Sequence, residues 1–301
     1  MQNIIALIWD FDKTLVDGYM QDPIFRHYQV DPAVFWAEVD ALPQRYRDEQ
    51  GVKVNRDTIY LNHFIRGARQ GRFPGLSNAR LRGFGRELRF YPGVPEIMVE
   101  LRDVARALPG AAEHNLRVEH YIVSTGFREV IMGSCVAEYA AGVWGCELID
   151  DIDEHGARIA EVAYTIDNTT KTRALFEINK GATRDNDLDV NARMSDEQRR
   201  IAFENMIYIA DGPSDIPAFS LIRSRGGYAL AVYPAGDEQA FAQVETLRQD
   251  GRVDTLAEAD YSHGSTACMV LSHRIRQLGA AMIRSEQQRM RPRGSVPRHL
   301  D

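Results

Sequence analysis

The chain has 301 residues, of which 44% are hydrophobic and 26% are charged. These are the proportions of a globular protein, and they exclude wholesale disorder, collagen and low-complexity architecture. The formal net charge of −7 argues against a nucleic-acid-binding protein, whose phosphate contacts need a basic surface.

The sequence also lacks the signals of export and membrane insertion. No apolar run approaches the roughly 18 residues that a membrane helix needs. The first residues carry neither the basic n-region nor the long apolar stretch of a signal peptide. The three cysteines, Cys135, Cys146 and Cys268, form no disulfide framework and no CxxC pair. We therefore expect a cytoplasmic protein with no membrane partner, and the sequence predicts no oligomeric state.

The chain opens with the apolar run 4–9, which is typical of a strand buried on both faces. From about residue 17 to 88 the pattern becomes helical. One helix is expected to begin at Asp31 and to end or kink at Pro43, and Ser77 is placed to cap another. We interpret 17–88 as a small helical domain inserted after the first strand; the alternative is that it forms part of one continuous domain.

Beyond residue 88 strands and helices alternate. The predicted elements are helices around 97–108 and 171–178, a hairpin within 144–159, and buried strands at 121–123, 206–210 and 228–233. This alternation predicts an α/β fold with a doubly wound parallel sheet, formed by residues 1–16 and 89–284. The polar stretch 181–200 is interpreted as a solvated loop. Residues 285–301 are interpreted as a disordered basic tail, with a basic docking arm as the alternative.

Polar residues follow three of the predicted strands directly. Ligands of parallel sheets bind beyond the carboxyl ends of the strands, so we expect these residues to meet there. A lysine opens the helix between the second and third of these strands. The candidate residues are Asp10, Asp12 and Thr14 after the first strand, Ser124 with the amides of Thr125 and Gly126 after the second, Asp211 and Asp215 after the third, and Lys171.

Several carboxylates at one point repel one another unless a cation lies among them. Oxygen ligands without His or Cys suit Mg²⁺, which also neutralises a bound phosphate. Ser124 and the amides beside it can bind an anion, and Lys171 adds a positive charge. Asp10 and Asp12 lie on one side of an extended chain, so one can attack phosphorus while the other transfers protons. The set as a whole fits phosphoryl transfer.

Each feature also has a simpler interpretation. Asp10 and Asp12 could be capping carboxylates of a strand-end turn, and Ser124 could cap only the helix that follows it. A lysine at a helix start is usually solvated; Lys180 is a poorer candidate than Lys171 because it ends its helix. The stretch 211–215 could be a simple Gly-Pro turn.

Four segments in order resemble the motifs of the haloacid dehalogenase superfamily. Asp-Phe-Asp-Lys-Thr-Leu at 10–15 resembles its DxDxT motif, and Ile-Val-Ser-Thr-Gly-Phe at 122–127 resembles its second motif. Lys171 matches the third motif, and Asp-Gly-Pro-Ser-Asp at 211–215 matches the fourth. The resemblance covers the core from the N-terminus to about residue 275.

This resemblance implies a role for each matched residue. Asp10 would be the nucleophile and Asp12 the general acid and base. Thr14 and Ser124 would hold the phosphoryl group, with Lys171 stabilising the nucleophile. Mg²⁺ would be bound by Asp10, the backbone carbonyl of Asp12 and Asp211, with Asp215 ligating through water or supporting that shell. The acid at position 12 points to phosphatases and phosphotransferases rather than dehalogenases.

Within the superfamily the closer resemblance is to the phosphoserine phosphatase branch, which has a helical C1-type cap between its first two motifs and a hairpin before the lysine. Thr125 stands where that branch has Gly, and the branch's substrate-binding Glu and Arg have no match here. The resemblance implies hydrolysis of a small phosphate monoester through an aspartyl phosphate. The alternatives are a phosphotransferase or phosphomutase, and a non-catalytic binding module on the same fold.

Overall fold

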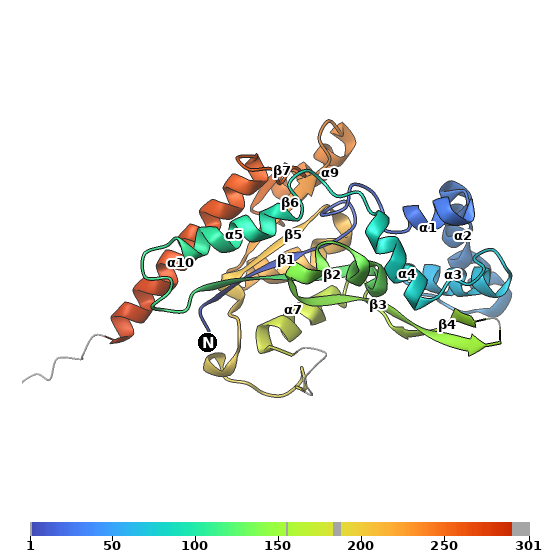
Figure 1. The fold of residues 1–301 in the computed structure, drawn as a ribbon, viewed down its shortest axis with the longest axis horizontal. Coiled ribbons are helices and arrows are strands. Elements are labelled where there is room, and N and C mark those ends of the chain that lie inside the picture. Colours follow the sequence, from blue (N-terminus) through green and yellow to red (C-terminus); the bar gives the residue numbers. More distant parts are fainter. Residues whose placement is uncertain (1, 155, 183–187, 291–301) are drawn as a thin grey trace, which may run out of the picture.

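The structure is a computed structural model that describes residues 2–154, 156–182 and 188–290. In this part of the chain one seven-stranded sheet has the order β4-β3-β2-β1-β5-β6-β7 (Figure 1). All neighbouring strands are parallel except β3 and β4, which form an antiparallel hairpin. The predicted doubly wound parallel sheet is thus confirmed. The strands are β1 (Ile4–Trp9), β2 (Arg117–Phe127), β3 (Ala140–Asp153), β4 (Gly156–Tyr164), β5 (Met206–Ala210), β6 (Tyr228–Tyr233) and β7 (Thr255–Glu258).

Helices cover both faces of the sheet. α5 (Glu96–Arg106) and α10 (Thr266–Met290) pack along each other on one face, and α7 (Lys171–Lys180) lies on the opposite face (Figure 1). α8 (Ile216–Ser224) packs against α7 and β5, and α9 (Glu238–Gln249) packs against β6 and β7. Every residue of β1 and β5 is buried, because strands flank both their edges and helices cover both their faces.

Four helices between β1 and β2 form a separate group at one end of the molecule (Figure 1). They are α1 (Asp22–Tyr28), α2 (Pro32–Gln50), α3 (Ile59–Arg69) and α4 (Asn78–Phe84). Phe25, Phe35 and Phe64 pack against one another inside this group. The β3–β4 hairpin reaches beneath it, where α3 packs on β4. The division between core and cap at residues 17 and 88 stays a prediction.

Two adjacent segments connect this helical group to the sheet. Val16, where the chain leaves the sheet, forms an antiparallel bridge with Phe90, where it returns. The amide of Asp17 donates to the carbonyl of Arg89 at 2.9 Å, and Tyr91 donates to Leu15 at 3.0 Å. The connection is therefore a short two-stranded neck.

The structure corrects three sequence-based expectations. α2 does not end at Pro43 but continues to Gln50; the buried residues Phe35, Val39 and Leu42 pack along it, and the proline removes one backbone hydrogen bond. β2 extends beyond Val123 to Phe127, with an irregular register against β3 over that stretch. Residues 285–290 are helical as the end of α10, so the predicted tail began too early.

Parts of other expectations fall outside the described residues. This applies to residues 291–301 of the predicted tail and to 183–187 of the predicted loop. β7 was not anticipated, since its four residues show little apolar alternation. Of the helices that the structure describes, none combines the length and the apolar character needed to cross a bilayer.

The central strands hold a buried histidine. His120 is fully buried in β2, where its Nδ1 accepts from the indole of Trp9 at 3.1 Å. Because the indole can only donate, Nε2 carries the ring proton and donates to the carbonyl of Met98 at 2.9 Å. Burial lowers the pKa of His120 to about 3, so the ring stays neutral in the folded protein.

We predict that this histidine makes the protein less stable in acid. Between pH 6.5 and about 3 the unfolded chain binds a proton here that the folded protein does not bind, so the free energy of unfolding falls as the pH falls. His120→Gln removes this dependence. Urea unfolding measures the free energy of unfolding of the wild type and of His120→Gln at each pH. The wild-type value minus the variant value should therefore fall by about 1.4 kcal/mol for each pH unit below 6.5. Parallel curves for wild type and His120→Gln would contradict the prediction.

Candidate active site

Strand register brings the predicted site together. Trp9, the last residue of β1, lies opposite Ile122 of β2 and Ile209 of β5. The residues that follow on these three strands therefore emerge at one edge of the sheet. They include Asp10 and Asp211. The amide of Asp10 donates to the carbonyl of Ile209 at 2.9 Å, which fixes the first turn of the loop to β5.

Lys171 lies at the centre of this edge. Its Nζ donates to Asp10 Oδ1 at 2.7 Å and to Asp215 Oδ1 at 2.6 Å, and all three side chains are buried. Lys171 is the first residue of α7, so this one side chain joins that helix to the ends of β1 and β5. Asp10, Asp211 and Asp215 each offer an oxygen, and these oxygens lie within 4.8 Å of one another.

The cluster carries more negative charge than its lysine balances. Burial raises the pKa of Asp10 to about 6, although the charge of Lys171 opposes this shift. Burial, followed by the charges of Asp10 and Asp215, raises the pKa of Asp211 to about 7. Burial alone would lower the pKa of Lys171, but the carboxylates of Asp10 and Asp215 outweigh burial and raise it. Closely spaced oxygens with excess negative charge fit a divalent cation such as Mg²⁺.

Asp12 and Thr14 lie in the loop that follows β1. This loop turns back on itself because the amides of Leu15 and Val16 donate to the carbonyl of Phe11. Thr14 Oγ1 donates to Asp10 Oδ2 at 3.4 Å. Asp12 Oδ1 accepts from the amide of Met20 at 2.7 Å, so its carboxylate faces the start of the helical group rather than the three-carboxylate cluster. Burial, and next the charge of Asp10, raises the pKa of Asp12 well above its usual value.

The second predicted segment contacts the helical group directly. Ser124 is buried and its Oγ accepts from the amide of Gly126 at 3.0 Å. The carbonyl of Thr125 accepts from the hydroxyl of Tyr60, on α3, at 2.7 Å. Gly126 packs against Met20, and a Cβ at this glycine would lie 2.2 Å from the methionine methyl group. This segment therefore meets two parts of the helical group at close range.

No family model matches the sequence. An uncharacterized protein of Borreliella burgdorferi is 37% identical over 278 residues, covering 88% of this chain and 94% of that protein, so the two belong to one family. A haloacid dehalogenase family hydrolase from Salmonella enterica serovar Typhi has a TM-score of 0.52 at 14% identity, covering 90% of this chain and 70% of that one. This chain has the haloacid dehalogenase fold.

A substrate-bound phosphoserine phosphatase has the same fold. Its TM-score is 0.50 at 17% identity, with 85% of this chain and 93% of that chain covered. The fold expected from the four motifs is confirmed. At these identities the likeness concerns the fold alone, and the roles of the individual residues stay predictions.

Two residues that contact the Asp10–Lys171–Asp215 cluster of this haloacid dehalogenase fold were missed by sequence analysis. Tyr208 lies within the apolar run of β5, and its hydroxyl donates to Asp215 Oδ1. Ser214 Oγ donates to Asp215 Oδ2 at 2.7 Å. Together with Lys171 they engage both oxygens of Asp215. A tyrosine inside a fully buried strand needs a partner for its hydroxyl, and this was the signal available for Tyr208.

We predict that Lys171 stabilises the fold by compensating buried charge. Lys171→Met should lower the free energy of unfolding by about 3–5 kcal/mol, because it leaves two buried carboxylates unpaired. Adding Asp215→Asn should recover part of that loss, since one unpaired charge is removed. Urea unfolding of the two single variants and the double variant measures this coupling.

Lys180→Met is the matched control. Lys180 ends the same helix. Within the described part of the chain, its Nζ donates to the backbone carbonyls of Val190 and Ala192 and to no carboxylate. Among the residues that the structure describes, its replacement leaves no carboxylate unpaired, so it should cost far less. Strictly additive losses for Lys171→Met and Asp215→Asn would show that the three groups do not act as one unit.

Proposed function

We propose that the protein is a Mg²⁺-dependent phosphatase that hydrolyses a small phosphate monoester through an aspartyl phosphate. One observation carries the proposal: a buried lysine bridges Asp10 and Asp215 at the edge of the sheet where three predicted motif segments end. A structural ion pair alone would not account for the third carboxylate, Asp211, beside them.

Asp10 is the proposed nucleophile. It directly follows β1, and its two oxygens are positioned by Lys171 and Thr14. In the first step a carboxylate oxygen of Asp10 bonds to phosphorus as the bond to the ester oxygen breaks, and Asp12 gives its proton to that leaving oxygen. In the second step water attacks the phosphoaspartate and gives its proton to Asp12. Asp10 and inorganic phosphate are released.

The remaining residues bind charge. Asp10, the backbone carbonyl of Asp12 and Asp211 would hold Mg²⁺, which when bound neutralises charge on the phosphoryl group. Asp215 supports the site by holding Lys171, because protein donors engage both its oxygens. Thr14, Ser124, Lys171 and the amides of Thr125 and Gly126 would bind the phosphoryl oxygens. Because the Gly126 amide bonds to Ser124 Oγ here, phosphate binding would exchange that contact.

The helical group is the proposed cap. Met20 contacts both the first and second motif segments, through the carboxylate of Asp12 and the amide of Phe127. Tyr60 bonds to the second segment from α3. Apolar and aromatic side chains at this boundary exclude water from the phosphoryl group during transfer. A cap of this kind selects the organic part of the substrate.

The decisive experiment replaces the nucleophile. Asp10→Asn should reduce Mg²⁺-dependent hydrolysis of an aryl phosphate by about a thousandfold or more, because the amide does not attack phosphorus. Asp103→Asn, an exposed position on α5, is the control and should keep wild-type activity. A chelator should abolish the wild-type activity. Near-normal turnover by Asp10→Asn, or turnover in excess chelator, would overturn the proposal.

A second experiment tests the contact between cap and core. Tyr60→Phe removes the hydrogen bond to the carbonyl of Thr125 and should lower kcat/KM about tenfold, equivalent to about 1.4 kcal/mol. Tyr28→Phe is the matched control, since Tyr28 donates to the carbonyl of Pro74 within the cap, at 3.1 Å. Equal effects of the two substitutions would assign Tyr60 to cap stability only.

A further inference from the structure

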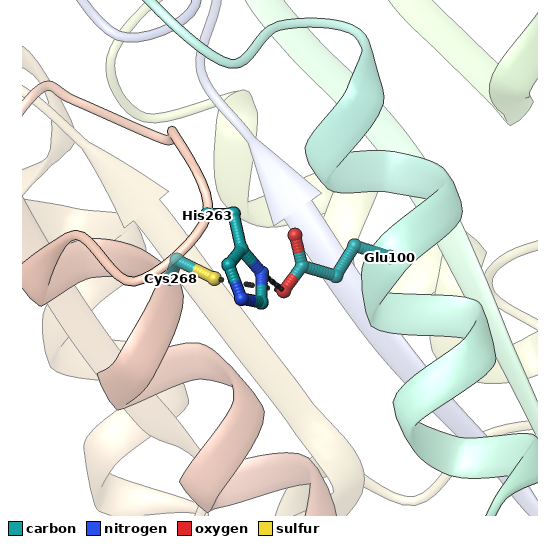
Figure 2. Close-up of side chains that lie close together, drawn as sticks. All are labelled: Glu100, His263 and Cys268. Atoms are coloured by element: carbon teal, nitrogen blue, oxygen red, sulfur yellow. Dashed lines mark hydrogen bonds and ion pairs between the residues drawn. The ribbon is translucent and has the colours of Figure 1, made fainter.

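Three potential metal ligands converge on the side of the core where α5 and α10 pack together (Figure 2). Glu100 comes from α5, His263 from the loop after β7, and Cys268 from the first turn of α10. One ligand atom of each residue lies within 4.8 Å of the other two. The group is separate from the carboxylates of the proposed active site and shares no residue with them.

The contacts within this group place protons where a cation would lie. His263 Nδ1 donates to Glu100 Oε1 at 2.8 Å, and the thiol of Cys268 donates to the same oxygen at 3.3 Å (Figure 2). Ligand atoms around tetrahedral Zn²⁺ are roughly 3.3–3.7 Å apart, given bonds of about 2.0–2.3 Å. The sulfur–oxygen separation already fits this range, and the nitrogen–oxygen separation needs to widen only slightly.

Contacts between the ligand-bearing segments hold the three residues in place. The amide of Tyr261 donates to the carbonyl of Pro92 at 2.8 Å, which ties the loop of His263 to the segment before α5. Gly93, at φ +81°, touches the backbone of Tyr261 so closely that an added Cβ would lie 2.2 Å from it. The hydroxyl of Ser265 accepts from the amide of Cys268 at 3.2 Å and fixes the first turn of α10. Little reorganisation is needed to bind an ion.

The group is also open to solvent. The side chain of His263 is 90% exposed, whereas Cys268 is buried. An ion can enter from the exposed side, and water can complete a four-coordinate shell there. We propose that Glu100, His263 and Cys268 form a second metal site, which binds a thiophilic divalent cation such as Zn²⁺. On binding, the neutral imidazole coordinates through Nδ1 and carries its ring proton on Nε2 instead, and the thiol releases its proton to water, so two anionic ligands, the carboxylate of Glu100 and the thiolate of Cys268, balance the ion. Mg²⁺ would not compete, because it prefers oxygen ligands.

An ion at this position would stiffen the loop that supports the first motif. Tyr261, two residues before His263, donates its hydroxyl to the carbonyl of Thr14 at 2.7 Å. Its ring packs edge-on against that of Trp9, with the centroids 5.6 Å apart. The ion would therefore join α5 to α10 next to Tyr261, which contacts the loop that carries Asp10 and Asp12.

Cobalt tests the site without relying on the proposed activity. Co²⁺ bound to a thiolate gives a charge-transfer absorption in the near ultraviolet, which the all-oxygen active site does not produce. Titration of the full chain with Co²⁺ should give this band with one ion per chain, and Zn²⁺ should displace it. Cys268→Ser should abolish the band, while Cys135→Ser, at an exposed cysteine, should leave it unchanged.

Replacing His263, whose side chain is exposed, tests the metal site without disturbing the folded state. His263→Ala should weaken Co²⁺ binding at least tenfold with no loss of the folded state in thermal melting, because that side chain is solvent-exposed. Glu100→Gln should also weaken it. No thiolate band in the wild type, a band that survives Cys268→Ser, or binding that is insensitive to His263→Ala would each overturn the proposal.

Discussion

The ammonium of Lys171, held between two carboxylates at a buried edge of the sheet, is the interaction on which the rest of the site depends. Burying three such charges is costly unless each has partners, and here Thr14, Tyr208 and Ser214 complete the network. The same side chain joins the start of α7 to the ends of β1 and β5. One contact thus supports both the packing of a helix and the orientation of the proposed nucleophile.

The network leaves a net negative charge, because three carboxylates, those of Asp10, Asp211 and Asp215, lie beside the single ammonium of Lys171. Burial, together with the charge of the neighbouring carboxylates, raises the pKa of Asp10 to about 6 and that of Asp211 to about 7. A divalent cation would remove the excess and allow an anionic substrate to approach. The excess negative charge and the proposed phosphatase chemistry therefore depend on the same carboxylates.

The helical group meets the rest of the molecule through direct contacts at several points. Val16 and Phe90 form the neck, and Met20 and Tyr60 touch the two motif segments. A change in the position of the helical group would therefore alter the surroundings of both Asp12 and Thr125. Along the face covered by α5 and α10, Tyr261 connects the first motif to the Glu100–His263–Cys268 group. The loop after β1 is thus held by Met20 through Asp12 and by Tyr261 through Thr14.

Local sequence was sufficient for the central strands and the residues at their ends. The runs at 4–9 and 206–210 are apolar because both faces of the sheet are covered, and Asp10 and Asp211 follow where the chain leaves that environment. The tertiary structure alone decided which ends meet, because strand register depends on pairing between distant segments. The tertiary structure likewise decided that Tyr208 and Tyr60 contact the candidate site, and that Glu100 and Cys268 lie close together. Such contacts join residues far apart in the chain, and no local pattern of hydrophobicity or turn formation encodes them.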